Sequence, residues 1–172
     1  MFLLQVFVIP SGSMENTLLI GDRVAVQKVS GFQRGDIVVF RDDYGWMPAS
    51  QAKHPGPWQS ALMFLGLLPD EGQTYLVKRA IGVAGDHVVC CDASGRLTVN
   101  GAALDETTYL FADSAGQQVV PSEMKFDLVV PQGKIFVMGD HRNASADSRC
   151  HLATSYNGVL GGSAFISTTS FV

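Results

Sequence analysis

Residues 74–86 read TYLVKRAIGVAGD. The first half of this stretch is rich in β-branched and other apolar residues and its end carries two glycines, a pattern typical of a buried strand that runs into a turn. Similar short runs, bounded by Gly, Asp or Pro, recur at residues 5–9, 23–28, 36–40, 87–91, 96–99, 134–138 and 163–168. Together with residues 74–81 they predict many short strands joined by turns, and therefore a mostly β protein rather than a helical bundle.

Length and composition fit this class. The chain has 172 residues, of which 47% are hydrophobic, and it contains 18 glycines. That length suits one domain, or one domain with a sizeable insertion, and is sufficient to bury a core. The net charge is -4 and lysine and arginine do not cluster, so the sequence lacks the basic surface that nucleic-acid binding requires. No nucleic-acid partner is predicted.

Two stretches interrupt the strand pattern. Residues 42–72 are rich in proline and glycine and are predicted as a loop insertion, within which residues 58–68 form one short helix that is apolar nearly all round. We expect this helix to pack against the core rather than against a membrane surface. Residues 92–130 combine a hairpin-like segment with a polar loop and are predicted as a smaller, peripheral β subdomain. The remaining core is discontinuous and comprises residues 1–41, 73–91 and 131–172.

Three cysteines, Cys90, Cys91 and Cys150, cannot all pair within one chain. We do not expect the two adjacent cysteines to bond with each other, because the α-carbon spacing of a trans dipeptide barely meets the need of a disulfide. Either Cys90 or Cys91 could bridge to Cys150 in an oxidising compartment, or all three could be buried thiols.

The N-terminal sequence MFLLQVFVIP is apolar, but it is shorter than the ~20 residues that a membrane-spanning helix needs. It also lacks the basic region of a signal peptide. Two interpretations are open from sequence: an ordinary first strand, or the end of a membrane anchor that precedes this chain.

Two polar blocks stand out against the apolar strands. Residues 9–18 read IPSGSMENTL, in which Ser11 and Ser13 occupy a turn after a strand. Alone, such serines are ordinary turn formers or helix caps, and Glu15 stands where the hydrolase motif G-x-S-x-G needs its second glycine. Residues 138–149 read MGDHRNASADSR, whose density of hydroxyl, carboxylate and guanidinium groups predicts an internal hydrogen-bond network.

A third block places Lys78 within the apolar strand at residues 74–81. A lysine on an edge strand commonly faces solvent. If Lys78 is buried instead, desolvation disfavours its charged form and lowers its pKa by several units, which yields a neutral amine able to accept a proton.

Taken in order, these blocks resemble the signature boxes of bacterial type I signal peptidases, serine proteases with a Ser-Lys dyad. The family motifs P-S-x-S-M-x-P-T, K-R-x-x-G-x-x-G-D and G-D-N-R-x-x-S-x-D-S-R are similar to the segments that begin at Pro10, Lys78 and Gly139. The strand at residues 35–40 is similar to a further box. Each motif is weak alone, but four in the family's order make the match specific, while the two interrupting stretches match only loosely.

The resemblance implies roles for residues at matching positions. It implies that Ser13 is the nucleophile and that Lys78, as a neutral amine, is the general base. A serine hydroxyl is a weak nucleophile and needs such a base beside it, so the residue types fit this chemistry. Ser11 matches the serine whose hydroxyl forms the oxyanion hole together with the backbone N–H of Ser13.

Other positions match supporting residues of the family or depart from it. Ser145 matches the serine that hydrogen-bonds and orients the lysine, and Asp147 and Arg149 match the charged residues that brace its loop. Asn16 replaces the usual proline, and we expect little effect because no chemical group is lost. His141 replaces the usual asparagine and is expected to alter local hydrogen bonding.

The resemblance also implies a fold, an activity and a location. The implied fold is mostly antiparallel β, as a partly open barrel. The implied activity is removal of signal peptides from secreted preproteins after Ala-x-Ala-like sites, on the extracytoplasmic face of the cell membrane and without a cofactor or metal. Signal peptides and the membrane surface are the implied partners, and the substrate is expected to pair as an extended strand near residues 76–78 or 5–9. The residues expected to line its small pockets are Phe7, Ile9, Met14, Leu18, Leu76 and Val77.

Other assignments use the same residues. A self-cleaving repressor of the Ser-Lys type shares this chemistry, but it would carry a DNA-binding domain, of which the sequence shows no sign. A Ser-His-Asp protease could combine Ser13 with His141 and with Asp140 or Asp147, in an unusual chain order. Residues 122–125 fit the S-x-x-K motif of penicillin-binding enzymes, but the companion motifs K-T-G and S-D-N are missing.

A non-catalytic interpretation is also open. The chain could be a β-rich module that binds signal peptides without cleaving them, in which case Lys78 would titrate like a surface lysine, with a pKa of ~10.4. A metal enzyme is not expected, because the four histidines show no H-E-x-x-H or similar ligand spacing.

Overall fold

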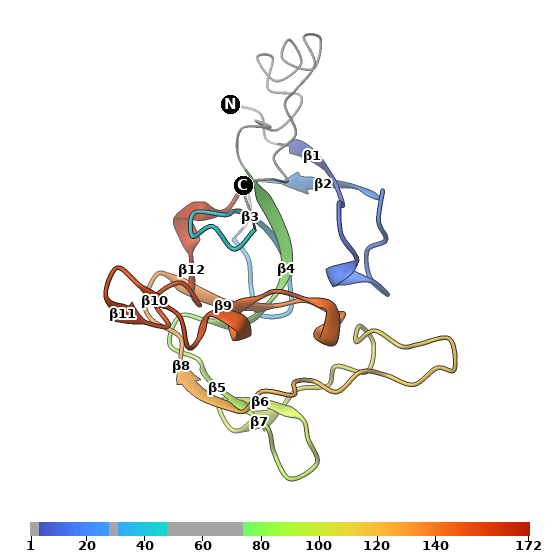
Figure 1. The fold of residues 1–172 in the computed structure, drawn as a ribbon. Coiled ribbons are helices and arrows are strands. Elements are labelled where there is room, and N and C mark those ends of the chain that lie inside the picture. Colours follow the sequence, from blue (N-terminus) through green and yellow to red (C-terminus); the bar gives the residue numbers. More distant parts are fainter. Residues whose placement is uncertain (1–3, 28–30, 48–73) are drawn as a thin grey trace.

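The structure is a computed structural model that describes residues 4–27, 31–47 and 74–172. Within these ranges the regular structure consists of short strands and single 3₁₀ turns, so the predicted mostly β class is confirmed (Figure 1). The helix predicted at residues 58–68 lies outside the described residues. The strands are β1 (Leu4–Val8), β2 (Arg23–Gln27), β3 (Ile37–Arg41), β4 (Tyr75–Val83), β5 (His87–Cys90), β6 (Leu97–Val99), β7 (Ala102–Ala103), β8 (Phe126–Val129), β9 (Lys134–Met138), β10 (Ser155–Tyr156), β11 (Val159–Leu160) and β12 (Ile166–Ser167). The 3₁₀ turns are η1 (Gly12–Met14), η3 (Arg142–Ala144), η4 (Ser148–His151) and η5 (Thr168–Ser170).

A four-stranded antiparallel sheet with the strand order β12-β9-β4-β3 carries Lys78. Its longest strand, β4, changes partners along its length. β4 pairs with β3 from Tyr75 to Arg79, but it pairs with β9 only from Arg79 to Val83. Lys78 therefore lies just before the point at which β9 joins β4.

From Ile135 to Met138, β9 is buried on both faces, which explains the unbroken apolar sequence of these four residues. Ile135 and Val137 belong to a core cluster with side chains of β3 and β12, whereas Phe136 and Met138 belong to a second cluster with side chains of β5 and β6. Neighbouring side chains of a strand point to opposite faces, so a strand that separates two cores needs apolar residues at every position.

The second cluster joins the first sheet to another four-stranded antiparallel sheet, with the order β7-β6-β5-β8. Figure 1 shows this sheet at the bottom of the molecule, below β9. Gly82 is required where the two sheets approach, because a β-carbon there would lie 2.6 Å from Cγ2 of Val88 and 2.9 Å from Cγ2 of Val130.

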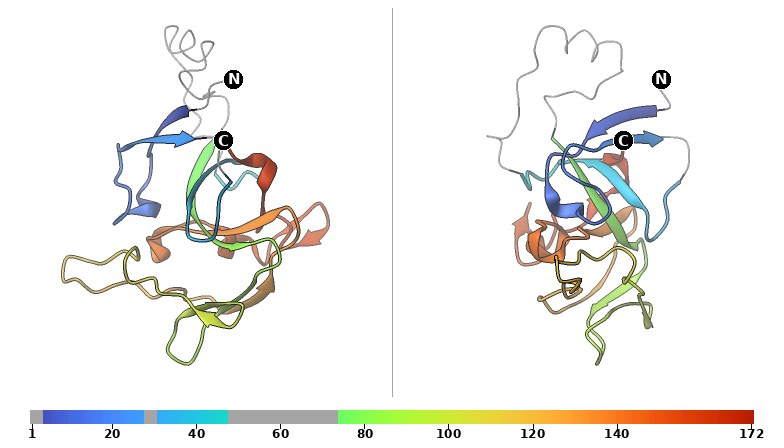
Figure 2. Two further views of the ribbon diagram at one scale, coloured as in Figure 1. Left: turned by 180° about the vertical axis from the view of Figure 1, so that it is seen from behind. Right: turned by 90° about the vertical axis from the view of Figure 1, so that its right-hand side faces the viewer.

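β1 and β2 form a separate antiparallel pair that carries Ser13. Figures 1 and 2 show the connection between the two strands, which contains η1, extending toward the end of β9. A hydrogen bond from Ile9 N to Asp22 O (2.9 Å) closes the base of this connection. The ring of Phe7 packs edge-on against Tyr75 of β4, with the ring centroids 5.2 Å apart, and so links the hairpin to the larger sheet.

Each strand predicted from sequence overlaps an observed strand, while the short strands β7, β8, β10 and β11 were not predicted. The expectation for the cysteines was wrong. Cys90 and Cys91 form a disulfide with their α-carbons 3.0 Å apart, and Cys150 is free and exposed. The peptide bond between the bonded pair is cis, whereas the expectation assumed the longer trans spacing. Within the described ranges, no helix has the length and apolar composition that crossing a bilayer requires.

Candidate active site

Ser13 and Lys78 meet at the junction of the β1–β2 hairpin and the four-stranded sheet. The Nζ of Lys78 lies 2.6 Å from Oγ of Ser13, within hydrogen-bonding distance, although 65 positions separate the two residues in the chain. The Lys78 residue is only 3% exposed and Ser13 only 8%. The structure therefore brings together the two residues predicted as base and nucleophile and shields both from water.

Burial changes the acid–base behaviour of Lys78. Removal of the ammonium group from water lowers the pKa of Lys78 from 10.5 to about 8, and the negative charges of Asp147 and Asp140 oppose this shift without cancelling it. A lysine with a pKa near 8 supplies a substantial fraction of neutral amine at mildly alkaline pH, which a surface lysine does not.

The turn that presents Ser13 is anchored by its neighbour Met14, whose side chain is buried. The carbonyl oxygen of Met14 accepts hydrogen bonds from Thr17 N (3.0 Å) and Leu18 N (2.8 Å), which fold the chain back after η1. Ser11 precedes η1 in an extended conformation, and its exposed hydroxyl makes no capping hydrogen bond. That hydroxyl remains available at the surface two residues from Ser13.

Asn16, at the position where the family motif has proline, adopts a φ of 84°. Proline is fixed near -65° and cannot adopt this conformation, whereas asparagine is among the residues that tolerate it. The side-chain amide also donates a hydrogen bond to Leu110 O (3.3 Å). The backbone after the nucleophile therefore adopts a conformation here that the family's proline could not adopt.

The loop after β9 contacts the site, and its shape is held by the buried carboxylate of Asp147. Asp147 accepts hydrogen bonds from Gly139 N (3.0 Å) and from Nε (2.9 Å) and Nη2 (2.8 Å) of Arg149. Arg149 Nη2 also donates to Arg142 O (2.7 Å). In the same loop, His141 N donates to the carbonyl oxygen of Ser13 (3.1 Å). The loop thus contacts the backbone of the predicted nucleophile directly.

Asp140 was considered from sequence only as a member of a Ser-His-Asp arrangement, but the structure gives it a different place, beside Arg79. Its carboxylate is fully buried and accepts hydrogen bonds from Nε (2.8 Å) and Nη2 (2.7 Å) of Arg79 and from Oγ1 of Thr17 (2.5 Å). It therefore joins β4, the nucleophile segment and the loop after β9. Arg79 and Asp140 both belong to the quoted motif boxes, K-R and G-D, and that membership was the available signal.

Ser145, predicted to orient Lys78, makes no hydrogen bond through its side chain within the described residues, although its Oγ is buried. The oxygen packs against Gly139, where a β-carbon would overlap it. Its orienting role stays a prediction.

The predicted pocket residues differ in their surroundings. Phe7, Ile9 and Met14 are buried, whereas Leu18, Leu76 and Val77 are partly exposed. A groove of about 610 Å³ runs between β2 and β3, and Val77 is the predicted residue that lines it. The other members of its wall include Val24, Val26, Val38, Val39 and Phe171.

The imidazole of His141 is engaged elsewhere. Its Nδ1 lies 2.9 Å from Oε2 of Glu15, and its ring stacks on Phe111 with the centroids 3.8 Å apart. Asp140 and Asp147 are occupied by Arg79 and Arg149, so neither carboxylate orients a histidine toward Ser13. This geometry does not support a Ser-His-Asp arrangement. In the ranges that the structure describes, no three His, Cys, Asp or Glu side chains gather as metal ligands would.

A buried hydroxyl beside a desolvated amine has the parts of a serine hydrolase site in which lysine replaces histidine as the base. Comparison with known proteins agrees with this class. The family described as "Signal peptidase, peptidase S26" matches residues 1–172, and the chain belongs to this family.

Two relatives that are similar in sequence support the assignment. A protein named signal peptidase I from Mycobacterium tuberculosis (strain H37Rv) is 38% identical over 168 residues, which cover 87% of this chain and 56% of the relative. Signal peptidase I from Bacillus licheniformis is 32% identical over 155 residues, covering 86% and 67%. A crystal structure of a signal peptidase I from Enterococcus faecalis V583 shares 26% identity with a TM-score of 0.45, and covers 84% of this chain and 96% of that one. The chain spans about half the length of the mycobacterial relatives it matches.

Proposed function

We propose that this chain is the catalytic part of a signal peptidase: a serine endopeptidase that removes signal peptides from secreted preproteins after Ala-x-Ala-like sites. Ser13 is the nucleophile and Lys78 the general base. The observation that carries the proposal is the 2.6 Å separation of Lys78 Nζ and Ser13 Oγ inside a buried site. Membership in the signal peptidase family supports the choice of substrate class.

The proposed reaction proceeds in two halves. Neutral Lys78 accepts the hydroxyl proton of Ser13 while Oγ attacks the carbonyl carbon of the scissile peptide bond. The protonated amine then donates that proton to the leaving nitrogen, the C–N bond breaks, and an acyl-enzyme ester remains. Lys78, neutral again, takes a proton from water while the water oxygen attacks the ester carbon. The bond from that carbon to Ser13 Oγ then breaks, Lys78 returns the proton to Oγ, and the signal peptide leaves with a new carboxyl group.

The backbone edge of β4 offers a place for the substrate. The pairing of β4 with β9 starts only at Arg79, so β4 is flanked by β3 alone at Leu76–Lys78 in the described part of the chain. An extended peptide that adds to this edge would place its carbonyl groups next to Ser13. Val39 and Val77 are directly paired across β3 and β4, so their side chains lie on one face, and both line the groove between β2 and β3.

An apolar surface near the hairpin suits the membrane as the second partner. Leu4, Val6 and Val8 alternate along β1 and are exposed, as are Leu19 and Ile20 in the connection that carries Ser13. Exposed apolar patches of this kind are typical of interaction surfaces. We place the protein at the extracytoplasmic face of the cell membrane, where the apolar segment of a signal peptide ends.

A peptide with a single Ala-x-Ala site tests the proposal. Wild-type protein should cleave it after the second alanine, and a matched peptide with Phe in place of that alanine should remain intact. Mass spectrometry of the products identifies the bond. Cleavage of both peptides at unrelated bonds, or of neither, would contradict the proposed function.

The pH dependence of cleavage should report the amine. Because the proposed base works only when neutral and the pKa of Lys78 is about 8, kcat/KM should rise about tenfold per pH unit below pH 8 and level off above it. Initial rates between pH 6 and pH 10 measure this, with circular dichroism at each pH as the control for folding. A profile that is already flat at pH 7 would point to another base.

Ser11→Ala should slow the enzyme without abolishing it. The exposed hydroxyl of Ser11 is proposed to stabilise, together with the backbone N–H of Ser13, the negative charge that develops on the oxygen of the scissile carbonyl. The loss of one oxyanion donor typically reduces kcat by about 10²- to 10³-fold. Steady-state kinetics should show this loss with little change in KM. Ser11→Thr keeps the hydroxyl and serves as the control; equal losses in both variants would argue against a donor role.

A further inference from the structure

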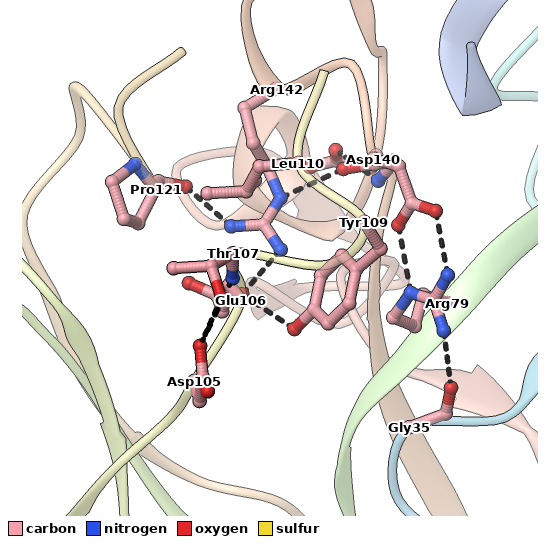
Figure 3. Close-up of polar contacts among 12 residues, drawn as sticks. Gly35, Arg79, Asp105, Glu106, Thr107, Tyr109, Leu110, Pro121, Asp140 and Arg142 are labelled. Carbon is pink, nitrogen blue, oxygen red and sulfur yellow. Dashed lines mark hydrogen bonds and ion pairs between the residues drawn. The ribbon is translucent and has the colours of Figure 1, made fainter. Parts of the chain in front are cut away.

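A short segment of the peripheral region, Asp105–Phe111, lies against the loop that supports the dyad (Figure 3). At its centre the buried carboxylate of Glu106 accepts two hydrogen bonds through Oε1. Arg142 Nη2 donates one (2.5 Å) and the hydroxyl of Tyr109 donates the other (2.9 Å). Glu106 and Arg142 are both almost fully buried, so each charge depends on the other for compensation.

The first branch from Glu106 fixes the shape of the loop through Arg142. Its Nε donates to Gly139 O (2.8 Å) and its Nη1 to Pro121 O (2.7 Å). The guanidinium thereby ties the fourth residue of the loop back to its first residue. Between these two residues lies His141, whose N–H holds the carbonyl oxygen of Ser13.

The second branch reaches the residue next to the base. The ring of Tyr109 covers the guanidinium of Arg79, with Cζ 4.1 Å from the ring centroid, and Arg79 in turn makes the bidentate contact with Asp140. Burial, and then the charge of Glu106, raise the pKa of Tyr109, so its hydroxyl stays a donor to the carboxylate. Arg79 directly follows Lys78 on β4.

A third contact closes the same arrangement. Phe111 N donates to Asp140 O (3.1 Å), and the Phe111 ring stacks on the imidazole of His141. One segment of seven residues therefore contacts three successive loop residues, Asp140, His141 and Arg142.

We propose that Glu106 is a positioning residue for the Ser13–Lys78 site, acting through Arg142 and Tyr109 on the loop that holds the Ser13 carbonyl. Within the described residues, the side chain of Glu106 is hydrogen-bonded to Arg142 and Tyr109, and to neither reacting group nor the β4 edge proposed for the substrate. Its loss should therefore lower the rate of the chemical step and leave substrate binding intact. This inference rests on the proposed function for its kinetic test, and a second test below does not.

The kinetic test compares Glu106→Gln with a matched control on the adjacent residue. Asp105→Asn makes the same chemical change at an exposed carboxylate whose hydrogen bonds go to N and Oγ1 of Thr107. We expect Glu106→Gln to reduce kcat for the Ala-x-Ala peptide between about 10- and 100-fold with KM unchanged, because small misplacements of reacting groups are that costly. Asp105→Asn should match wild type. Tyr109→Phe removes one hydroxyl but keeps the ring on Arg79, and it should show a smaller loss of kcat. It replaces Glu106→Gln as the test variant if Glu106→Gln does not fold.

The second test needs no activity. Hydrogen exchange measures the protection of His141 N–H, whose acceptor is Ser13 O. In Glu106→Gln this amide should exchange about tenfold faster or more, while amides in β9 such as Val137 keep their protection. This result together with an inactive wild type would reject the proposed function but retain the positioning role. Two results in Glu106→Gln would overturn the inference. One is exchange of the His141 amide at the wild-type rate, and the other is faster exchange throughout both sheets that follows a loss of overall stability.

Discussion

Ser13→Ala and Lys78→Met should each reduce cleavage of an Ala-x-Ala peptide by about 10⁴-fold or more. Removal of any one member of a nucleophile–base pair leaves only the catalysis that binding and oxyanion stabilisation supply. The double variant should be no slower than either single variant, because the two groups act as one unit. Lys125→Met, at an exposed lysine, is the matched control and should retain wild-type rates.

The same lysine variant should make the protein more stable near neutral pH. In the unfolded chain Lys78 has an ordinary pKa, whereas in the folded protein its pKa is about 8. The folded state therefore binds the proton more weakly, and protonated Lys78 destabilises it. That difference corresponds to a cost of about 3 kcal/mol below pH 8, and the cost disappears as the pH rises from 8 toward 10.5. In urea unfolding, the free energy of unfolding of Lys78→Met should exceed that of wild type by a few kcal/mol at pH 7, and the difference should be smaller at pH 10. A variant that is inactive and also less stable at pH 7 would contradict a desolvated amine.

Gly139→Ala should disable the site through its backbone. A β-carbon on Gly139 would overlap Oγ of Ser145 and lie 2.5 Å from the carbonyl oxygen of Ser13. A side chain such as Ser145 can rotate away, but the Ser13 carbonyl is part of the turn that presents the nucleophile. We therefore expect a loss of activity of about 10²-fold or more, together with a loss of about 1–3 kcal/mol in stability from overpacking.

Gly82→Ala separates these two effects. A β-carbon there would be equally crowded, by Val88 and Val130, but in the core between the sheets rather than beside Ser13. Its stability should fall to a similar extent, while the activity of each folded molecule stays near wild type. Equal activity losses in the two variants, measured at a temperature where both are folded, would show that crowding at Gly139 has no particular connection with the site.

Local patterns were sufficient to predict eight of the strands, and the resemblance to the family motifs pointed to the two residues of the proposed dyad. Runs of β-branched residues between turn formers identify β4 and β9, because such residues pack well in a pleated and buried surface. Ser13 and Lys78 followed from motif order, and the structure adds that a polar pair 65 positions apart lies in one buried place.

The supporting network could not be predicted in the same way. Glu106 and Arg142 are 36 positions apart, and Arg79 and Asp140 are 61 apart, so nothing in a local pattern pairs them. Glu106 meets Arg142 because the chain after β7 folds back toward the loop after β9, and Arg79 meets Asp140 because β4 pairs with β9. The φ of 84° at Asn16 and the disulfide between Cys90 and Cys91 likewise depend on local backbone conformations that residue identity alone does not determine.

The separation of the β1–β2 hairpin from the four-stranded sheet has a consequence for control of the enzyme. In the described part of the chain no strand pairing connects these two units. The distance between the Ser13 hydroxyl and the Lys78 amine is therefore set by side-chain and loop contacts, such as that of Phe7 with Tyr75, which together form the seam between the units. A small molecule that wedges into this seam could silence turnover while leaving both sheets, and the surface presented to other proteins, unaltered. Mutations along the seam could likewise adjust turnover by degrees while both reacting residues remain in place.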